Sequence, residues 1–169
     1  MILRILANTP LWVWGLLAAL LALGISQMFT RSASLARVIF LPAAMIGLAI
    51  YGIFSVFGAN PAVLLAWCAA AAFAVPALLS RPVPAGTRYD AATRRFTLPG
   101  SPLPLLLILG IFLTKYAVGV TLAMRPALGG ETGFALSVAG LYGIFSGILL
   151  GRALRLRRLA RTPRAIAAS

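Results

Sequence analysis

Residues 38–80 read VIFLPAAMIGLAIYGIFSVFGANPAVLLAWCAAAAFAVPALLS and contain no charged side chain. As one helix this stretch would extend over about 65 Å, at about 1.5 Å per residue, which is roughly twice the hydrocarbon thickness of a bilayer. The chain must therefore fold back within it. The only turn signal is Gly58-Ala59-Asn60-Pro61, where glycine can end one helix and Asn-Pro can begin the next. The sequence predicts two antiparallel membrane-spanning helices, at residues 38–57 and 62–79.

Apolar runs of similar length predict three further spans. They are residues 10–28, 103–124 and 132–151. The intervening residues 80–102 are rich in proline and arginine, so we expect a loop outside the membrane, with a small β-hairpin on the membrane surface. Residues 152–169 are predicted to be a basic tail that continues the last helix as far as Pro163.

The composition agrees with an all-α, polytopic transmembrane bundle forming a single domain. Of 169 residues, 62% are hydrophobic and 10% charged, and the mean hydropathy is +1.01. Soluble domains are about 45–50% apolar and about a quarter charged. Apolar residues on this scale exclude intrinsic disorder.

The charges predict an orientation. Lys and Arg number 15 against 2 Asp and Glu. Five crossings place twelve basic residues on one side of the membrane and two on the other, and the positive-inside rule makes the richer side cytoplasmic. We therefore expect the N-terminus outside and the C-terminus inside, in a bacterial cytoplasmic membrane. The basic residues are then explained by anionic lipid headgroups rather than by nucleic acid.

Few residues could support metal, cofactor or catalytic chemistry. The chain has no His, one cysteine (Cys68) and two carboxylates (Asp90 and Glu131). Zinc and haem sites of the usual kind and an internal disulfide are excluded on that ground. We expect no metal, no cofactor and no catalytic residues. A Ser/Lys dyad is also not expected, because no serine lies at helical spacing from the one intramembrane lysine, Lys115.

Lys115 is the sharpest candidate for function, because it interrupts the fourth predicted span near its middle. Ionisable residues inside a membrane are costly and are functional candidates by default. The hypothesis is a small transport or permeation protein for an anionic or polar solute. Its predicted site comprises Lys115, Tyr116, Tyr51, Ser55, Tyr142 and Ser146. The alternative for Lys115 is a lipid-facing side chain that extends to the outer boundary.

Two patterns bear on helix packing and symmetry. The segment YGIFS occurs at Tyr51–Ser55 and again at Tyr142–Ser146, in helices predicted to run in opposite directions. This indicates either an inverted repeat, as in many transporters, or chance recurrence. Small residues recur on the last span and predict close helix packing, either within the chain or in a dimer. They are Gly143, Gly147 and Gly151.

The tail supports a second hypothesis, in which the protein is a non-catalytic accessory or scaffold. It would bind anionic lipid headgroups, a second copy or a partner membrane protein through its basic loop and tail. The predicted headgroup contacts are Arg152, Arg155, Arg157, Arg158 and Arg161.

The chain resembles uncharacterised bacterial multipass inner-membrane proteins of about 170 residues. The resemblance covers roughly residues 88–119. It rests on Arg88-Tyr89-Asp90, on Phe96 and Leu98-Pro99-Gly100-Ser101, and on the apolar helix that carries Lys115 and Tyr116. The resemblance implies a membrane protein and does not indicate any particular activity.

Overall fold

The computed structural model describes residues 9–90 and 93–161, and most of them are helical. The elements in chain order are α2 (Leu11–Ser26), β1 (Arg31–Ser34), α3 (Leu35–Phe57), α4 (Pro61–Leu79), β2 (Arg88–Asp90), β3 (Arg95–Leu98), α5 (Leu103–Met124), the 3-10 helix η1 (Pro126–Gly130) and α6 (Thr132–Arg161).

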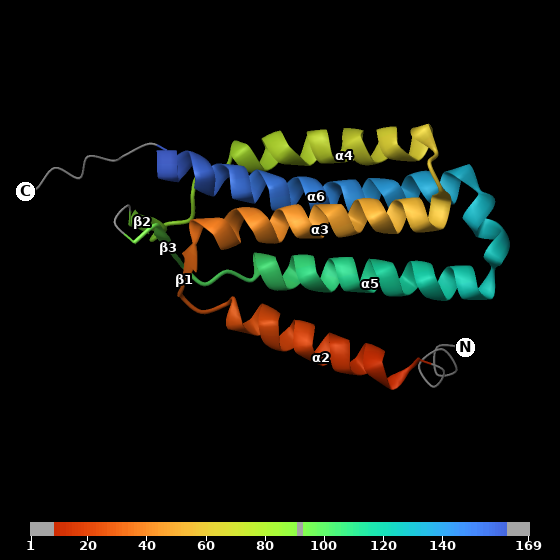
Figure 1. The fold of residues 1–169 in the computed structure, drawn as a ribbon, viewed down its shortest axis with the longest axis horizontal. Helices are drawn as coiled ribbons and strands as arrows, with labels where there is room; N and C mark the ends of the chain where they lie inside the picture. Colours follow the sequence, from red (N-terminus) through yellow and green to blue (C-terminus); the bar gives the residue numbers. More distant parts are fainter. Residues whose placement is uncertain (1–8, 91–92, 162–169) are drawn as a thin grey trace, which may run out of the picture.

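Successive helices run in alternating directions and form an elongated bundle with two distinct ends (Figure 1). One end carries the three strands, and we call it the sheet end. The other end carries the α3–α4 turn and η1, and we call it the loop end. Among the described residues, four helices are long and apolar enough to cross a membrane: α3, α4, α5 and α6.

The helix in the first predicted span, α2, is shorter than these four helices. Helix α2 has 16 residues, which gives about 24 Å, below the roughly 30 Å of a hydrocarbon core. It nevertheless lies along α5. Near the sheet end Gly24 packs against Leu105, and towards the loop end the hydroxyls of Thr9 and Tyr116 are hydrogen-bonded at 2.6 Å.

The α3–α4 turn follows from the four residues that form it. Gly58 has a φ of 66°, in the left-handed region, and its N–H donates to the carbonyl of Phe54 at 3.0 Å. Asn60 caps α4, since its side chain accepts from the N–H of Ala62 at 3.0 Å. Pro61 occupies the first helical position, where its missing N–H leaves no donor unsatisfied. Gly58, Asn60 and Pro61 each have a conformational reason for their place, so the turn between the two helices is defined locally.

The sheet contains one strand more than the expected hairpin. Strands β2 and β3 pair antiparallel, and β1 adds to the free edge of β3 with Arg31 opposite Leu98. The order is β1-β3-β2. Ser34 ends β1 and caps α3, because its side chain accepts from the N–H of Arg37 at 3.3 Å. The second helix therefore begins at Leu35, three residues earlier than the sequence predicts.

Two clusters of buried side chains hold the bundle together. The larger one joins α3, α4 and α6 and contains Ile53, Val63, Ala135, Val138, Ala139 and Tyr142. The smaller one joins the sheet to the end of α6 and contains Ala33, Phe96, Leu98 and Leu156. Helix α6 continues as one helix past residue 151 to Arg161, so the sheet packs on its basic extension. The expected helix end at Pro163 lies outside the described residues.

Candidate functional site

A small cavity lies between α3, α5 and α6 near the middle of the bundle. Its volume is about 20 Å³, enough for roughly one water molecule. It is lined by Met45, Leu48 and Ala49 of α3, Ile111 and Lys115 of α5, and Tyr142, Phe145, Ser146 and Leu149 of α6. The lining residues of α6 follow helical spacing, so a single face of that helix is turned towards the cavity.

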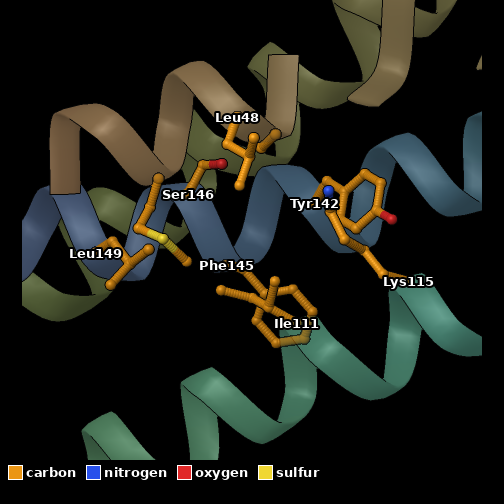
Figure 2. A pocket seen from close by; sticks show the side chains of 9 residues that line it. Leu48, Ile111, Lys115, Tyr142, Phe145, Ser146 and Leu149 are labelled. Atoms are coloured by element: carbon orange, nitrogen blue, oxygen red, sulfur yellow. The ribbon is translucent and has the colours of Figure 1, made fainter. Parts of the chain in front are cut away.

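Lys115 occupies the rim of this cavity. The residue is exposed, and its side chain extends from α5 towards Tyr142 on α6 (Figure 2). The Nζ atom also lies close to α3, 3.6 Å from the position that a Cβ would take on Gly52. No side chain in the described part of the chain forms an ion pair or a hydrogen bond with this ammonium. The ammonium is therefore directed at the neighbouring helices α3 and α6.

Two hydroxyl-bearing residues of α6 share the cavity with Lys115. Tyr142 is 6% exposed and Ser146 is 3% exposed, one helical turn apart. Ser146 lines the same cavity as Lys115, although no serine lies at helical spacing from Lys115 in the sequence. Among the described residues, no hydrogen bond connects Ser146 to Lys115.

Three of the six predicted site residues lie elsewhere. Tyr116 faces α2, where its hydroxyl is bonded to Thr9. Tyr51 is 70% exposed, because the face of α3 turned to the cavity is the one that carries Ala49 and Gly52. Ser55 donates to the carbonyl of Gly52 on its own helix at 3.0 Å and is also exposed.

The two copies of YGIFS thus have different surroundings. Tyr142 and Ser146 line the cavity, whereas Tyr51 and Ser55 do not. Helices α3 and α6 do run in opposite directions (Figure 1). The repeated segment therefore forms no symmetric pair of binding residues.

The three glycines of α6 pack within the chain against α4. A Cβ on Gly143 would overlap the carbonyl oxygen of Trp67, and one on Gly147 would lie 2.6 Å from that of Ala71. At Gly151 the corresponding distance to the Val75 carbonyl is 3.2 Å. Glycine is needed here because the two backbones approach each other too closely for a side chain.

The predicted headgroup arginines all lie on the extension of α6 at the sheet end. Arg152 and Arg155 are half-buried, and Arg157 and Arg158 are exposed. Arg161 is the last residue of α6, and its side chain is outside the described part. Arg31 is not among the residues predicted from the sequence, and β1 brings it to the same end of the bundle. No local signal could have found it, because its neighbour on the sheet is far away in sequence.

The described residues contain no group of three or more His, Cys, Asp or Glu side chains that could hold a metal ion. Cys68 is a free thiol on the exposed face of α4.

The family model of a family of unknown function, DUF6622, matches residues 1–168, and the chain belongs to that family. No curated protein and no solved structure matches it.

Proposed function

We propose that this member of a family of unknown function is a multipass protein of the bacterial cytoplasmic membrane that binds and passes a small anionic or polar solute at Lys115. The membrane location is supported by the four helices that are long and apolar enough to cross a bilayer. Their outward faces also carry large apolar side chains, such as Leu65 and Phe73 of α4, which are 69% and 78% exposed. Exposed apolar surface of this kind is stable in lipid and unfavourable in water.

The proposed orientation has the sheet end in the cytoplasm. Among the described residues, Arg125 is the one arginine at the loop end, and all other arginines lie at the sheet end. This asymmetry is the positive-inside pattern. We count α2 as a fifth crossing, because it accompanies α5 from Gly24 to Thr9 in spite of its short helix. An odd number of crossings then puts the N-terminus outside.

The main observation in support of a solute-binding site is the direction of the Lys115 side chain. An ammonium held within hydrocarbon is unfavourable unless it is paired, hydrated or able to reach the interface. Here Lys115 lines a cavity together with Tyr142 and Ser146, whose hydroxyls are potential hydrogen-bond donors to an anion, although the surface of the cavity itself is almost entirely apolar. A cation beside two hydroxyl donors favours an anionic ligand over a cationic one.

The cavity sets a condition on transport. Because its 20 Å³ holds about one water molecule, a larger solute can pass only if α5 moves away from α6. Helix α5 contacts α6 closely at Gly110, where a Cβ would come within 2.9 Å of the Phe145 ring. We propose that this contact is the point where the path opens.

Flux through proteoliposomes tests the proposal. Purified full-length protein is reconstituted with known orientation, and entry of chloride, acetate, phosphate and neutral glycerol is compared with protein-free vesicles. The wild type should pass at least one anion, Lys115→Arg should retain that flux, and Lys115→Met should lose it by about tenfold, equivalent to about 1.4 kcal/mol. A wild-type protein that passes none of these solutes would overturn the transport proposal.

The accessory role is the second candidate. It is favoured by the large basic surface of the sheet end, where the small sheet packs directly on the extension of α6. The same flux measurement distinguishes the transport role from the accessory role, because an accessory protein passes no solute with or without Lys115.

A further inference from the structure

Strand β1 brings an arginine from the α2–α3 connection against the basic extension of α6. Side chains two residues apart on a strand point to the same face, so Arg31 faces the same way as Ala33. Ala33 packs with Leu156 of α6 in the smaller buried cluster. Arg152 precedes Leu156 by one helical turn and therefore lies on the same side of α6. Arg31 and Arg152 are thus directed to a common region between the sheet and the helix.

Arg31 is held in place there by its own contacts. Its Nη2 donates to the side-chain oxygen of Gln27 at 2.7 Å, and Gln27 is itself 7% exposed. The guanidinium is half-buried. Burial, and to a smaller extent the nearby positive charge of Arg37, lowers the pKa of Arg31.

Arg152 connects Arg31 to a third guanidinium. It interacts electrostatically with both Arg31 and Arg155, and all three charges have the same sign. Arg155 donates through Nη1 to the carbonyl of Pro82 at 3.1 Å. Its Nε is buried and has no hydrogen-bond partner among the described residues. The region therefore contains an unsatisfied donor as well as unbalanced positive charge.

Among the described residues, no carboxylate acts on these three cations. Of the chain's two acidic residues, Glu131 lies at the loop end, between η1 and α6. Asp90 is exposed on β2, where it accepts a hydrogen bond from Thr93 at 2.6 Å. Half-buried like charges destabilise a fold unless an anion joins them.

We infer that Arg31, Arg152 and Arg155 form a binding site for a phosphate group. Planar guanidinium groups match phosphate oxygens with paired hydrogen bonds, which favours phosphate as the anion. The site lies where the apolar part of α6 gives way to its basic extension, at the depth of lipid headgroups if the helix spans the membrane. It goes beyond the solute site at Lys115 and is independent of it. The phosphate belongs either to an anionic phospholipid or to free inorganic phosphate.

Thermal unfolding of the full-length protein in detergent micelles tests this inference. The probes are phosphatidylglycerol, phosphatidylcholine, and phosphatidylcholine with added inorganic phosphate. For each variant, protection is the rise in Tm relative to phosphatidylcholine alone, so a general loss of stability cancels. The variants are Arg31→Gln, Arg152→Gln and, as a matched removal of one charge from an exposed position on α3 at the same end of the bundle, Arg37→Gln.

The wild type and Arg37→Gln should be protected equally, and Arg31→Gln and Arg152→Gln should lose most of that protection. Protection by phosphatidylglycerol alone identifies a lipid ligand, and protection by inorganic phosphate identifies a free one. Equal losses in all three variants would show diffuse charge attraction and overturn the site, as would a wild type that neither probe protects. Neither result depends on solute flux at Lys115.

Discussion

The ammonium of Lys115 on α5 lies against Gly52 of α3, with Nζ 3.6 Å from the position that a Cβ would occupy there. This contact turns the lysine across the bundle and gives it a neighbour on each of two other helices. The glycine matters because a larger side chain at this position would occupy the space that the ammonium uses.

Substitutions at Gly52 should therefore depend on size. Alanine would make an ordinary contact with Nζ, whereas leucine should displace the ammonium from the cavity and lower the Lys115-dependent anion flux. Gly47 on the same helix has open space around it, so Gly47→Leu is the matched control and should leave flux unchanged. Because alanine favours helix over glycine by about 1 kcal/mol, Gly52→Ala and Gly47→Ala should both retain stability. Equal flux in Gly52→Leu and Gly47→Leu would contradict the placement of Lys115.

Gly147→Ala should weaken the packing of α4 on α6. The new Cβ would lie 2.6 Å from the Ala71 carbonyl and 2.7 Å from the Ala74 Cβ, and overpacking of this kind costs about 1–3 kcal/mol. Gly140 on the same helix has no atom within 4 Å of its Cβ position, so Gly140→Ala should be neutral or stabilising. The free energy of unfolding in mixed micelles measures both. A Gly147→Ala protein as stable as Gly140→Ala would show that the helices are not in close contact.

The hydrogen bond between Thr9 and Tyr116 should contribute to the attachment of α2 to α5. Tyr116→Phe and Thr9→Val should each lower the free energy of unfolding by about 0.5–1.5 kcal/mol, and the double variant by little more than either single one. Tyr51→Phe removes a hydroxyl from an exposed position and should have no effect. Strictly additive losses at Thr9 and Tyr116 would mean that the two hydroxyls do not interact.

Reporter fusions should reveal the orientation. Ala59 is exposed in the α3–α4 turn at the loop end. A reporter that is active only outside the cytoplasm should work when inserted at Ala59 and should fail when fused after Ser169. The reverse pattern would invert the orientation, and activity at both positions would rule out three crossings between them.

Features encoded by neighbouring residues could be predicted from sequence. The α3–α4 turn is an example, because Gly58, Asn60 and Pro61 each have a local conformational reason to be there. The helices themselves also follow from uninterrupted apolar runs. Strand β1 had no such signal: its four residues form a strand only because β3, more than sixty residues later, offers a free edge.

The candidate site was predictable only in part, for the same reason. Lys115 was found because a charge within an apolar run is unusual in any context. Which hydroxyls accompany it depends on how helices rotate about their axes, and that is decided by packing. Tyr142 and Tyr51 lie in identical YGIFS segments, yet the first is buried in the cavity and the second is exposed. Identical local sequence cannot distinguish the two.

Access of water to residue 115 tests the central claim most directly. In a Cys68→Ala background, which removes the chain's single cysteine, Lys115→Cys is compared with Leu113→Cys. Leu113 lies two residues away on α5 and is 56% exposed, so it should face lipid at nearly the same depth. A membrane-impermeant thiol reagent requires a thiolate, which forms in water and not in hydrocarbon.

The account predicts that the reagent labels Lys115→Cys in reconstituted vesicles and leaves Leu113→Cys unlabelled. That difference would establish a hydrated path to the cavity between α3, α5 and α6. If both cysteines stay unlabelled while the protein is folded, no path that admits a molecule of the reagent's size reaches residue 115, and a site that passes solutes at Lys115 is contradicted.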